Sequence, residues 1–123
     1  MDKNVVGWFE IPVTDMERAK QFYSAVFKVA INHFPMPELE MATFPMDPNS
    51  NAVSGALVKG EGYAPSSTGS VLYFSCEDVA NELSRVEAAG GQILVRKTSL
   101  GEHGYMAHIL DTEGNRIALH SDS

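Results

Sequence analysis

The chain shows the same succession of elements twice, and this internal repeat limits its fold more than any other feature. Setting Asp15 against Asp78, an offset of 63 residues, aligns two helical patterns and the strand patterns around them. Sequence identity between the halves is low, so the repeat rests on hydrophobic patterning. Each half is predicted to form a strand, a helix and three further strands. Because one half alone leaves a face of its sheet bare, the two halves are expected to pack together.

The first half begins with an alternating stretch followed by a helical stripe. Residues 7–13 alternate between apolar and other side chains, which predicts a half-buried strand. Thr14, followed three residues later by Glu17, is typical of a capping box and predicts a helix over about residues 15–28. Shorter strands, broken by proline and by a polar loop, are expected in the segments 31–36, 39–44 and 53–58.

The second half restates this order. Asp78 is a good N-cap for a helix that Gly90 and Gly91 end. Strands are expected at 71–76, 92–97, 105–110 and 116–120. We therefore predict a single domain with module one at about 5–59, a linker at about 60–69 and module two at about 70–121.

Composition excludes several classes of function. The net charge of −7 and the scattered lysines and arginines argue against nucleic acid and against an anionic membrane surface. One cysteine, Cys76, lies in an apolar run, where a buried inert thiol is expected. The sequence shows neither a signal-peptide pattern nor an apolar run long enough to span a bilayer. A cytoplasmic protein is the expectation.

Several segments, in the expected order, carry a resemblance to a known family. They are FEIPVTD at 9–15, the pairs at 22–23 and 26–27, EAAGG at 87–91, GYMA at 104–107 and DTEGNRIALH at 111–120. These segments resemble the vicinal oxygen chelate superfamily, which includes glyoxalase I, extradiol dioxygenases, and fosfomycin- and bleomycin-resistance proteins. The resemblance implies an α+β fold in which two tandem βαβββ modules form a curled, cup-shaped mixed sheet with helices on its convex side. It also implies a homodimer.

The resemblance further implies where a metal would bind. Enzymes of the superfamily carry His, Gln or Glu ligands on inward positions of the first and last strands of each module. The matching positions here are Trp8, Val71, Ala118 and either Gly55 or Ala56. None of these side chains suits a divalent ion, so no metal and no other cofactor is expected. A displaced divalent metal held by Glu10, His108 and His120 is the alternative.

Five residues are predicted to line the cup. Alternation along the strands places Trp8 and Tyr73 where they would either stack against a flat ligand or simply fill the space that a metal occupies in related enzymes. Glu10 is the candidate acid or base, because burial in an apolar cup would raise its carboxyl pKa. A structural hydrogen bond is the competing interpretation of Glu10. Arg116 and His120 complete the set, whereas Glu61, Glu102 and Glu113 are expected to be solvated loop charges.

Three functions remain open at this point. The leading hypothesis is a metal-free, glyoxalase/bleomycin-resistance-like protein that binds a small organic molecule in the sheet cup. The second is a lyase or isomerase related to lactoylglutathione lyase, using Glu10 with or without a displaced metal. The third is a structural or regulatory module whose cup is closed by its own side chains. A fold resemblance alone does not decide among them.

Overall fold

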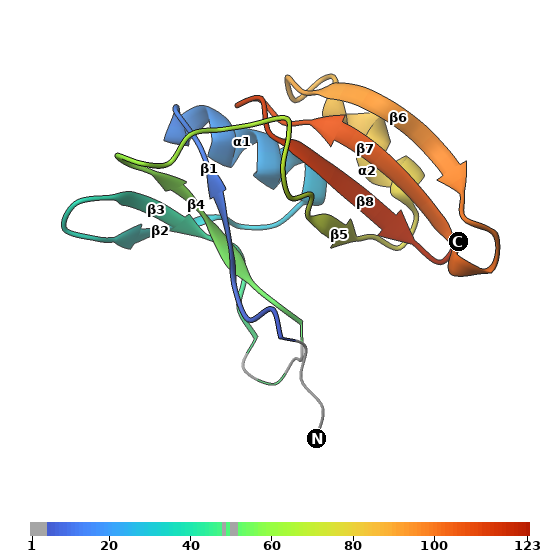
Figure 1. Ribbon diagram of the computed structural model, residues 1–123, viewed down its shortest axis with the longest axis horizontal. Helices are drawn as coiled ribbons and strands as arrows, with labels where there is room; N and C mark the ends of the chain where they lie inside the picture. The colour runs from blue at the N-terminus through green and yellow to red at the C-terminus, as the bar shows by residue number, and fades with distance from the viewer. Residues whose placement is uncertain (1–4, 48, 50–51) are drawn as a thin grey trace.

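The computed structural model describes residues 5–47, 49 and 52–123, which form two βαβββ modules in tandem (Figure 1). Module one contains β1 (Phe9–Pro12), α1 (Met16–Phe27), β2 (Asn32–Pro35), β3 (Glu40–Thr43) and β4 (Gly55–Lys59). Module two contains β5 (Tyr73–Ser75), α2 (Val79–Val86), β6 (Gln92–Ser99), the 3-10 turn η1 (Gly101–His103), β7 (Tyr105–Leu110) and β8 (Arg116–Ser121). Every strand and helix predicted from the sequence pattern is therefore present, with ends that differ by a few residues.

Each module forms its own four-stranded sheet with the same topology. The strand orders are β1-β4-β3-β2 and β5-β8-β7-β6. In both sheets the first strand of the module lies parallel to the last, and the other neighbours are antiparallel. This repetition confirms the internal repeat and the α+β class. Over the described ranges no strand pairing joins the two sheets, so a single chain carries two separate sheets rather than one continuous cup.

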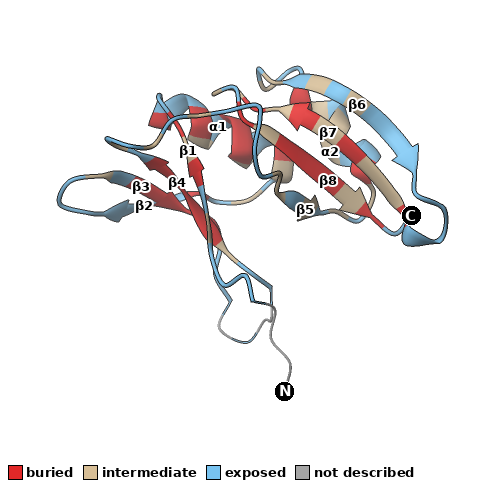
Figure 2. Cartoon of the chain, viewed as in Figure 1, coloured by how far each residue is buried: buried red, intermediate tan, exposed pale blue. Residues whose placement is uncertain are grey.

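Aromatic side chains join the two modules in a common core. The rings of Phe9 on β1 and Phe74 on β5 meet edge to face with centroids 5.8 Å apart. Tyr23 on α1 and Phe44 pack against the same group, Phe44 lying 5.8 Å from Phe74. Such aromatic pairs contribute beyond the area they bury. Figure 2 shows buried residues along α1, β4 and β8, whereas the edge strands β2 and β6 are mostly exposed.

Helix α1 is capped by Asp15 and not by the predicted Thr14. The Asp15 side chain accepts a hydrogen bond from the backbone N–H of Arg18 at 3.0 Å. Thr14 instead donates from its backbone nitrogen and its hydroxyl to Oε1 of Glu113, at 2.9 and 3.1 Å. Both residue types cap helices well, so local sequence does not decide between them. Glu113 of module two binds Thr14 and so leaves Asp15 to cap the helix.

Glu113 is consequently not the solvated loop charge that was expected. Its side chain has no solvent-exposed surface and forms an ion pair with Arg18 at 2.7 Å. Burial alone would raise the pKa of Glu113. Hydrogen bonds from Arg18 and from the backbone N–H groups of Asp15 and Thr14 outweigh burial and hold its pKa at about 2. Glu113 therefore stays ionised and anchors the start of α1.

The β7–β8 hairpin makes two further contacts with module one. Tyr23 Oη donates to Oδ2 of the buried Asp111 at 2.6 Å, and burial with the nearby carboxylate raises the pKa of Tyr23 well above its ordinary value. Asn115 Nδ2 donates to the backbone carbonyl of Pro12 at 2.8 Å. Together with Glu113, these contacts form what we call the hairpin anchor, which links the end of module two to the start of module one.

Helix α2 follows the prediction at its start and is shorter at its end. The side chain of Asp78 accepts a hydrogen bond from the backbone N–H of Ala80 at 2.9 Å and pairs with Lys97 at 2.9 Å. A run of turns follows Val86 and includes Gly90 at φ 101°, a left-handed conformation that glycine adopts without strain. Within the part of the chain that the structure describes, no helix is long and apolar enough to cross a bilayer.

Candidate functional site

The face of each sheet that lies opposite its helix, here called the open face, carries the predicted site residues. On module two, Tyr73, Ala118 and His108 stand side by side on β5, β8 and β7. Tyr73 Oη and His108 Nε2 lie 3.0 Å apart, and the two rings meet at 86° with centroids 5.5 Å apart. The row places the small Ala118 between the two larger residues. A methyl side chain there leaves room for this hydrogen bond.

Arg116 extends this contact into a network of three residues, the Tyr73–His108–Arg116 network. Arg116 Nε donates to His108 Nδ1 at 2.9 Å. An arginine N–H can only donate, so Nδ1 accepts and the ring proton of His108 lies on Nε2. Desolvation and the Arg116 charge lower the pKa of His108, which favours the neutral ring. The Nε2–H group then donates to Tyr73 Oη.

His120, which was also predicted for the site, lies on β8 two residues beyond Ala118 and on the same face. It pairs with Ser75 on β5 and Met106 on β7, and its Nε2 lies 2.7 Å from the backbone carbonyl of His103. Among the described residues no hydrogen bond connects His120 to Tyr73 or Arg116. The residue that does connect them is His108, which sequence reasoning named only as a possible metal ligand. The sequence left open which face of the sheet His108 presents, and the pairing of His108 with Ala118 decides it.

Module one presents a more apolar open face. Glu10 is exposed, so the predicted burial of its carboxyl group is not found within one chain, and Tyr63 Oη donates to its Oε1 at 3.1 Å. This hydrogen bond raises the pKa of Tyr63. The indole of Trp8, just before β1, is 42% exposed. Tyr63 also packs with other residues over the centre of the sheet, in a cluster of Leu39, Met41, Ala56, Val58 and Tyr63.

The two halves of the predicted site do not meet within one chain. Trp8 and Glu10 belong to the first sheet, and Tyr73, Arg116 and His120 belong to the second. Across the described segments, no hydrogen bond, ion pair or ring contact joins the first group to the second. Within a single chain, Trp8 and Tyr73 are therefore not arranged so that both could stack against one flat ligand.

The positions that would hold a metal in related enzymes offer no ligand atoms. A Cβ at Gly55 would point into the Phe9 ring and backbone, on the core side, so Ala56 is the residue on the open face. Ala56 pairs with Glu10 as Ala118 pairs with Tyr73, which makes the two alanines equivalent. Trp8 and Val71 precede the first strand of each module. An indole N–H, a valine and two alanines do not fit a divalent cation.

The displaced alternative is not assembled in the single chain either. In residues 5–47, 49 and 52–123, no three or more His, Cys, Asp or Glu side chains gather closely enough to hold an ion. Glu10 lies on the first sheet, and His108 and His120 lie on the second.

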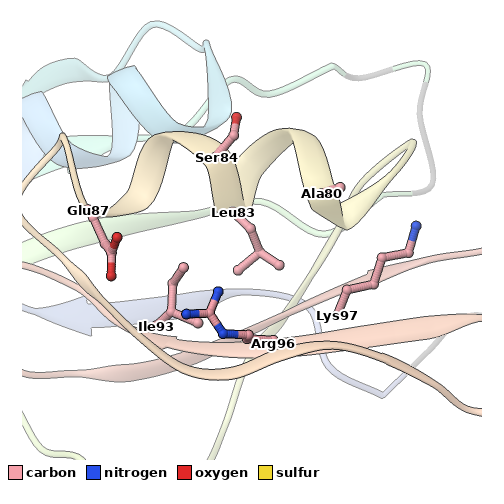
Figure 3. A pocket seen from close by; sticks show the side chains of 7 residues that line it. All are labelled: Ala80, Leu83, Ser84, Glu87, Ile93, Arg96 and Lys97. Carbon is pink, nitrogen blue, oxygen red and sulfur yellow. The ribbon is translucent and has the colours of Figure 1, made fainter.

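A groove between α2 and β6 lies on the helix-covered side of the second sheet (Figure 3). It contains none of the five predicted site residues. Arg96 and Lys97 from β6 and Glu87 from the end of α2 give it a mixed charge. Its complete lining is Ala80, Leu83, Ser84, Glu87, Ile93, Arg96 and Lys97.

Cys76 behaves as the sequence predicts. The thiol is partly buried directly after β5, and Sγ lies 3.6 Å from the carbonyl of Phe74. Desolvation and the neighbouring Glu82 carboxylate raise its pKa to about 12, so it stays protonated and unreactive at neutral pH.

Comparison with known proteins places this geometry in a family. Residues 5–119 match the model of the Glyoxalase/Bleomycin resistance protein/Dioxygenase superfamily. A glyoxylase-like domain-containing protein of Didymella fabae is 32% identical over 118 residues, covering 93% of this chain and 91% of that protein. "Putative glyoxylase CFP32" of Mycobacterium bovis is 28% identical over 119 residues, covering 92% of this chain. The chain spans 44% of that mycobacterial protein, less than half its length.

Solved structures share the fold at lower identity. TnmS3, an antibiotic binding protein from Streptomyces sp. CB03234, superposes with a TM-score of 0.74 at 24% identity, covering 100% of this chain and 99% of that one. The family match covers residues 5–119, which contain all the segments that carry the sequence resemblance except the final residue, His120. The chain belongs to the Glyoxalase/Bleomycin resistance protein/Dioxygenase superfamily.

Proposed function

We propose that this protein binds a small organic molecule on the open faces of its sheets, without a metal at the family's ligand positions. The observation that carries the proposal is the Tyr73–His108–Arg116 network beside Ala118. It presents an aromatic ring and a cation where a metal ligand would otherwise project. Small-molecule sites commonly combine aromatic walls with a few fixed polar groups. The similarity to a protein described as antibiotic binding supports the same function.

The binding site is completed by a second copy of the chain. Trp8 and Glu10 lie on one sheet and Tyr73, Arg116 and His120 on another, and each group needs an opposing wall. Module one also exposes large apolar side chains that a partner would cover. They are Val5, Val6, Trp8, Phe34, Met36, Met46 and Val53. Light scattering on the purified chain tests the homodimer, and a monomer at micromolar concentration would contradict it.

A thermal-shift screen tests binding, because a ligand of the folded state raises the melting temperature by mass action. The panel contains aromatic drugs and small carbonyl compounds. Elemental analysis of the same preparation tests the metal-free state. The proposal predicts at least one stabilising compound class and less than one divalent ion per chain. A stoichiometric ion whose binding needs Glu10 and a histidine would contradict the metal-free proposal.

A lyase or isomerase activity is the second candidate. The relative from Mycobacterium bovis carries a glyoxylase name, and Tyr63 fixes the carboxylate of Glu10 on the open face. In this function Glu10 would move a proton as acid or base, with or without a displaced ion held by Glu10, His108 and His120. Glu10→Gln should then abolish turnover of a small α-carbonyl substrate. Full activity in that variant would remove Glu10 from the reaction.

We also propose that the protein works in the cytoplasm. A single partly buried cysteine forms no internal disulfide, and the acidic net charge of −7 favours solubility. Fractionation of cells that express the tagged chain tests the location, and recovery outside the cytoplasmic fraction would contradict it.

A further inference from the structure

The Tyr73–His108–Arg116 network fixes the direction of its own hydrogen bonds. Arg116 Nε donates to His108 Nδ1, and His108 Nε2–H donates to Tyr73 Oη. The phenol oxygen is therefore used as an acceptor, and its own O–H proton does not point at His108. Tyr73 is 54% exposed. The hydroxyl group of Tyr73 is thus accessible to a ligand and has a proton to donate.

Arg116 supplies the other free donors. Its Nε is used by His108, and its two terminal amino groups form no hydrogen bond or ion pair with the residues that the structure describes. Over residues 5–47, 49 and 52–123, no carboxylate lies within ion-pair distance of Arg116. Arg18, Arg85 and Lys97, by contrast, each have an acidic partner. A guanidinium whose orientation is fixed but whose charge is not paired is suited to bind an anion.

Neutral His108 separates these two donors and adds no positive charge of its own. The hydrogen bonds hold both Tyr73 and Arg116 in place, so neither side chain has to be ordered by the ligand. The exposed ring of Tyr73 offers an aromatic surface beside them. The small Ala118 keeps the space between β5 and β7 free of a competing carboxylate.

We propose that the ligand is a planar organic anion, whose carboxylate or enolate oxygen binds Arg116 and the Tyr73 hydroxyl while its ring covers Tyr73. This inference rests on the proposed function and names the ligand class of the same site. The proposed function names only a small organic molecule, and this inference adds that the molecule carries a negative charge. Because the chain as a whole carries a net charge of −7, the attraction for an anion must come locally from Arg116.

Calorimetric titration of the full chain with matched acids and amides tests the proposal. The probes are benzoate and benzamide, 2-naphthoate and 2-naphthamide, and indole-3-acetate and indole-3-acetamide. Each acid should bind at least about tenfold more tightly than its amide, because charge-assisted hydrogen bonds are the stronger ones. In NMR spectra, the backbone amide chemical shifts that change on binding should centre on residues 73, 108 and 116.

Three variants assign the effect to the network. Arg116→Gln should remove the preference for the acid, because it weakens binding of the acid about tenfold more than binding of the amide. Tyr73→Phe keeps the ring, is at an exposed position, and should weaken acid binding about three- to tenfold. Arg96→Gln removes an exposed arginine from the α2–β6 groove and should change neither affinity.

Each outcome separates the ligand class from the general function. Equal affinity for acids and amides overturns the anion proposal and leaves small-molecule binding standing. An acid preference that survives both Arg116→Gln and Tyr73→Phe overturns the assignment to this network. Binding of no probe of either charge, together with a negative thermal-shift screen, overturns both proposals.

Discussion

The two modules share one topology and differ in what covers the centre of their open faces. In module one, Ala56 belongs to an apolar cluster against which Tyr63, four residues after the end of β4, packs. In module two, the equivalent Ala118 lies between Tyr73 and His108, within a polar network. A repeated backbone therefore does not impose a repeated surface. The centre of the open face of module one is covered by side chains of its own chain, whereas the open face of module two keeps hydrogen-bond donors available.

The comparison assumes that the two modules are held together by contacts between them. Asp111→Ala removes the most buried of these contacts and should have the largest effect on stability. The change leaves the buried hydroxyl of Tyr23 without its acceptor and removes one of the two acceptors of Asn115 Nδ2. We expect a loss of about 3 kcal/mol in the free energy of unfolding. Urea denaturation measures it. The exposed Asp122→Ala is the control and should change stability by less than about 0.5 kcal/mol.

Introducing a carboxylate at each of the two equivalent alanines compares the open faces directly. Ala56→Glu places a charge in an apolar cluster, whereas Ala118→Glu places it beside Arg116 and His108. We expect Ala56→Glu to cost about 2 kcal/mol more, because only the second carboxylate finds a cation. Urea denaturation of the two variants measures the difference. Equal losses would mean that the two faces are electrostatically alike.

Glu113→Gln tests how far module two orders module one. Removing the charge weakens hydrogen bonds to Thr14, Asp15 and Arg18, and should cost about 1.5 kcal/mol at pH 7. The folded-state pKa of about 2 lies below the unfolded value near 4.5. The stabilisation is therefore complete above about pH 5 and declines as the pH falls toward 2. Denaturation at several pH values checks this, and a loss independent of pH would contradict it.

The smallest expected effect concerns the protonation of His108. Arg116→Gln removes a neighbouring positive charge, so the pKa of His108 should rise. It should not rise fully to 6.5, because desolvation of the ring, the larger cause, remains. A proton NMR titration of the ring measures the shift. Arg96→Gln should leave the titration of His108 unchanged, and an equal shift in both variants would exclude a local interaction.

Periodicity in the sequence was sufficient to predict the fold. Alternation marked the strands, the stripe at residues 15–28 marked α1, and the offset between Asp15 and Asp78 aligned the modules. These signals are local or repeat at a fixed distance, so they survive in one sequence. The helix ends were less certain, because a cap depends on its partners.

The candidate site was only partly predictable. The sequence named Tyr73 and Arg116 as candidate binding residues, but it named His108, which forms hydrogen bonds with both in the structure, only as a possible metal ligand. Its role depends on strand register across β5, β8 and β7, which no local pattern shows. Glu113 was misjudged for the same reason, since its partners Thr14 and Arg18 come from the other end of the chain.

The hairpin anchor has a consequence for synthesis on the ribosome. Glu113 and its partner Thr14 are 99 residues apart, and α1 emerges long before the hairpin that holds its first turn. Module one can therefore form its strand pairings early, but the N-terminus of α1 stays without its ion pair and its hydrogen bonds until nearly all of this sequence has been translated. Domains commonly fold in the order in which they emerge. Here the later-made hairpin completes the earlier-made module.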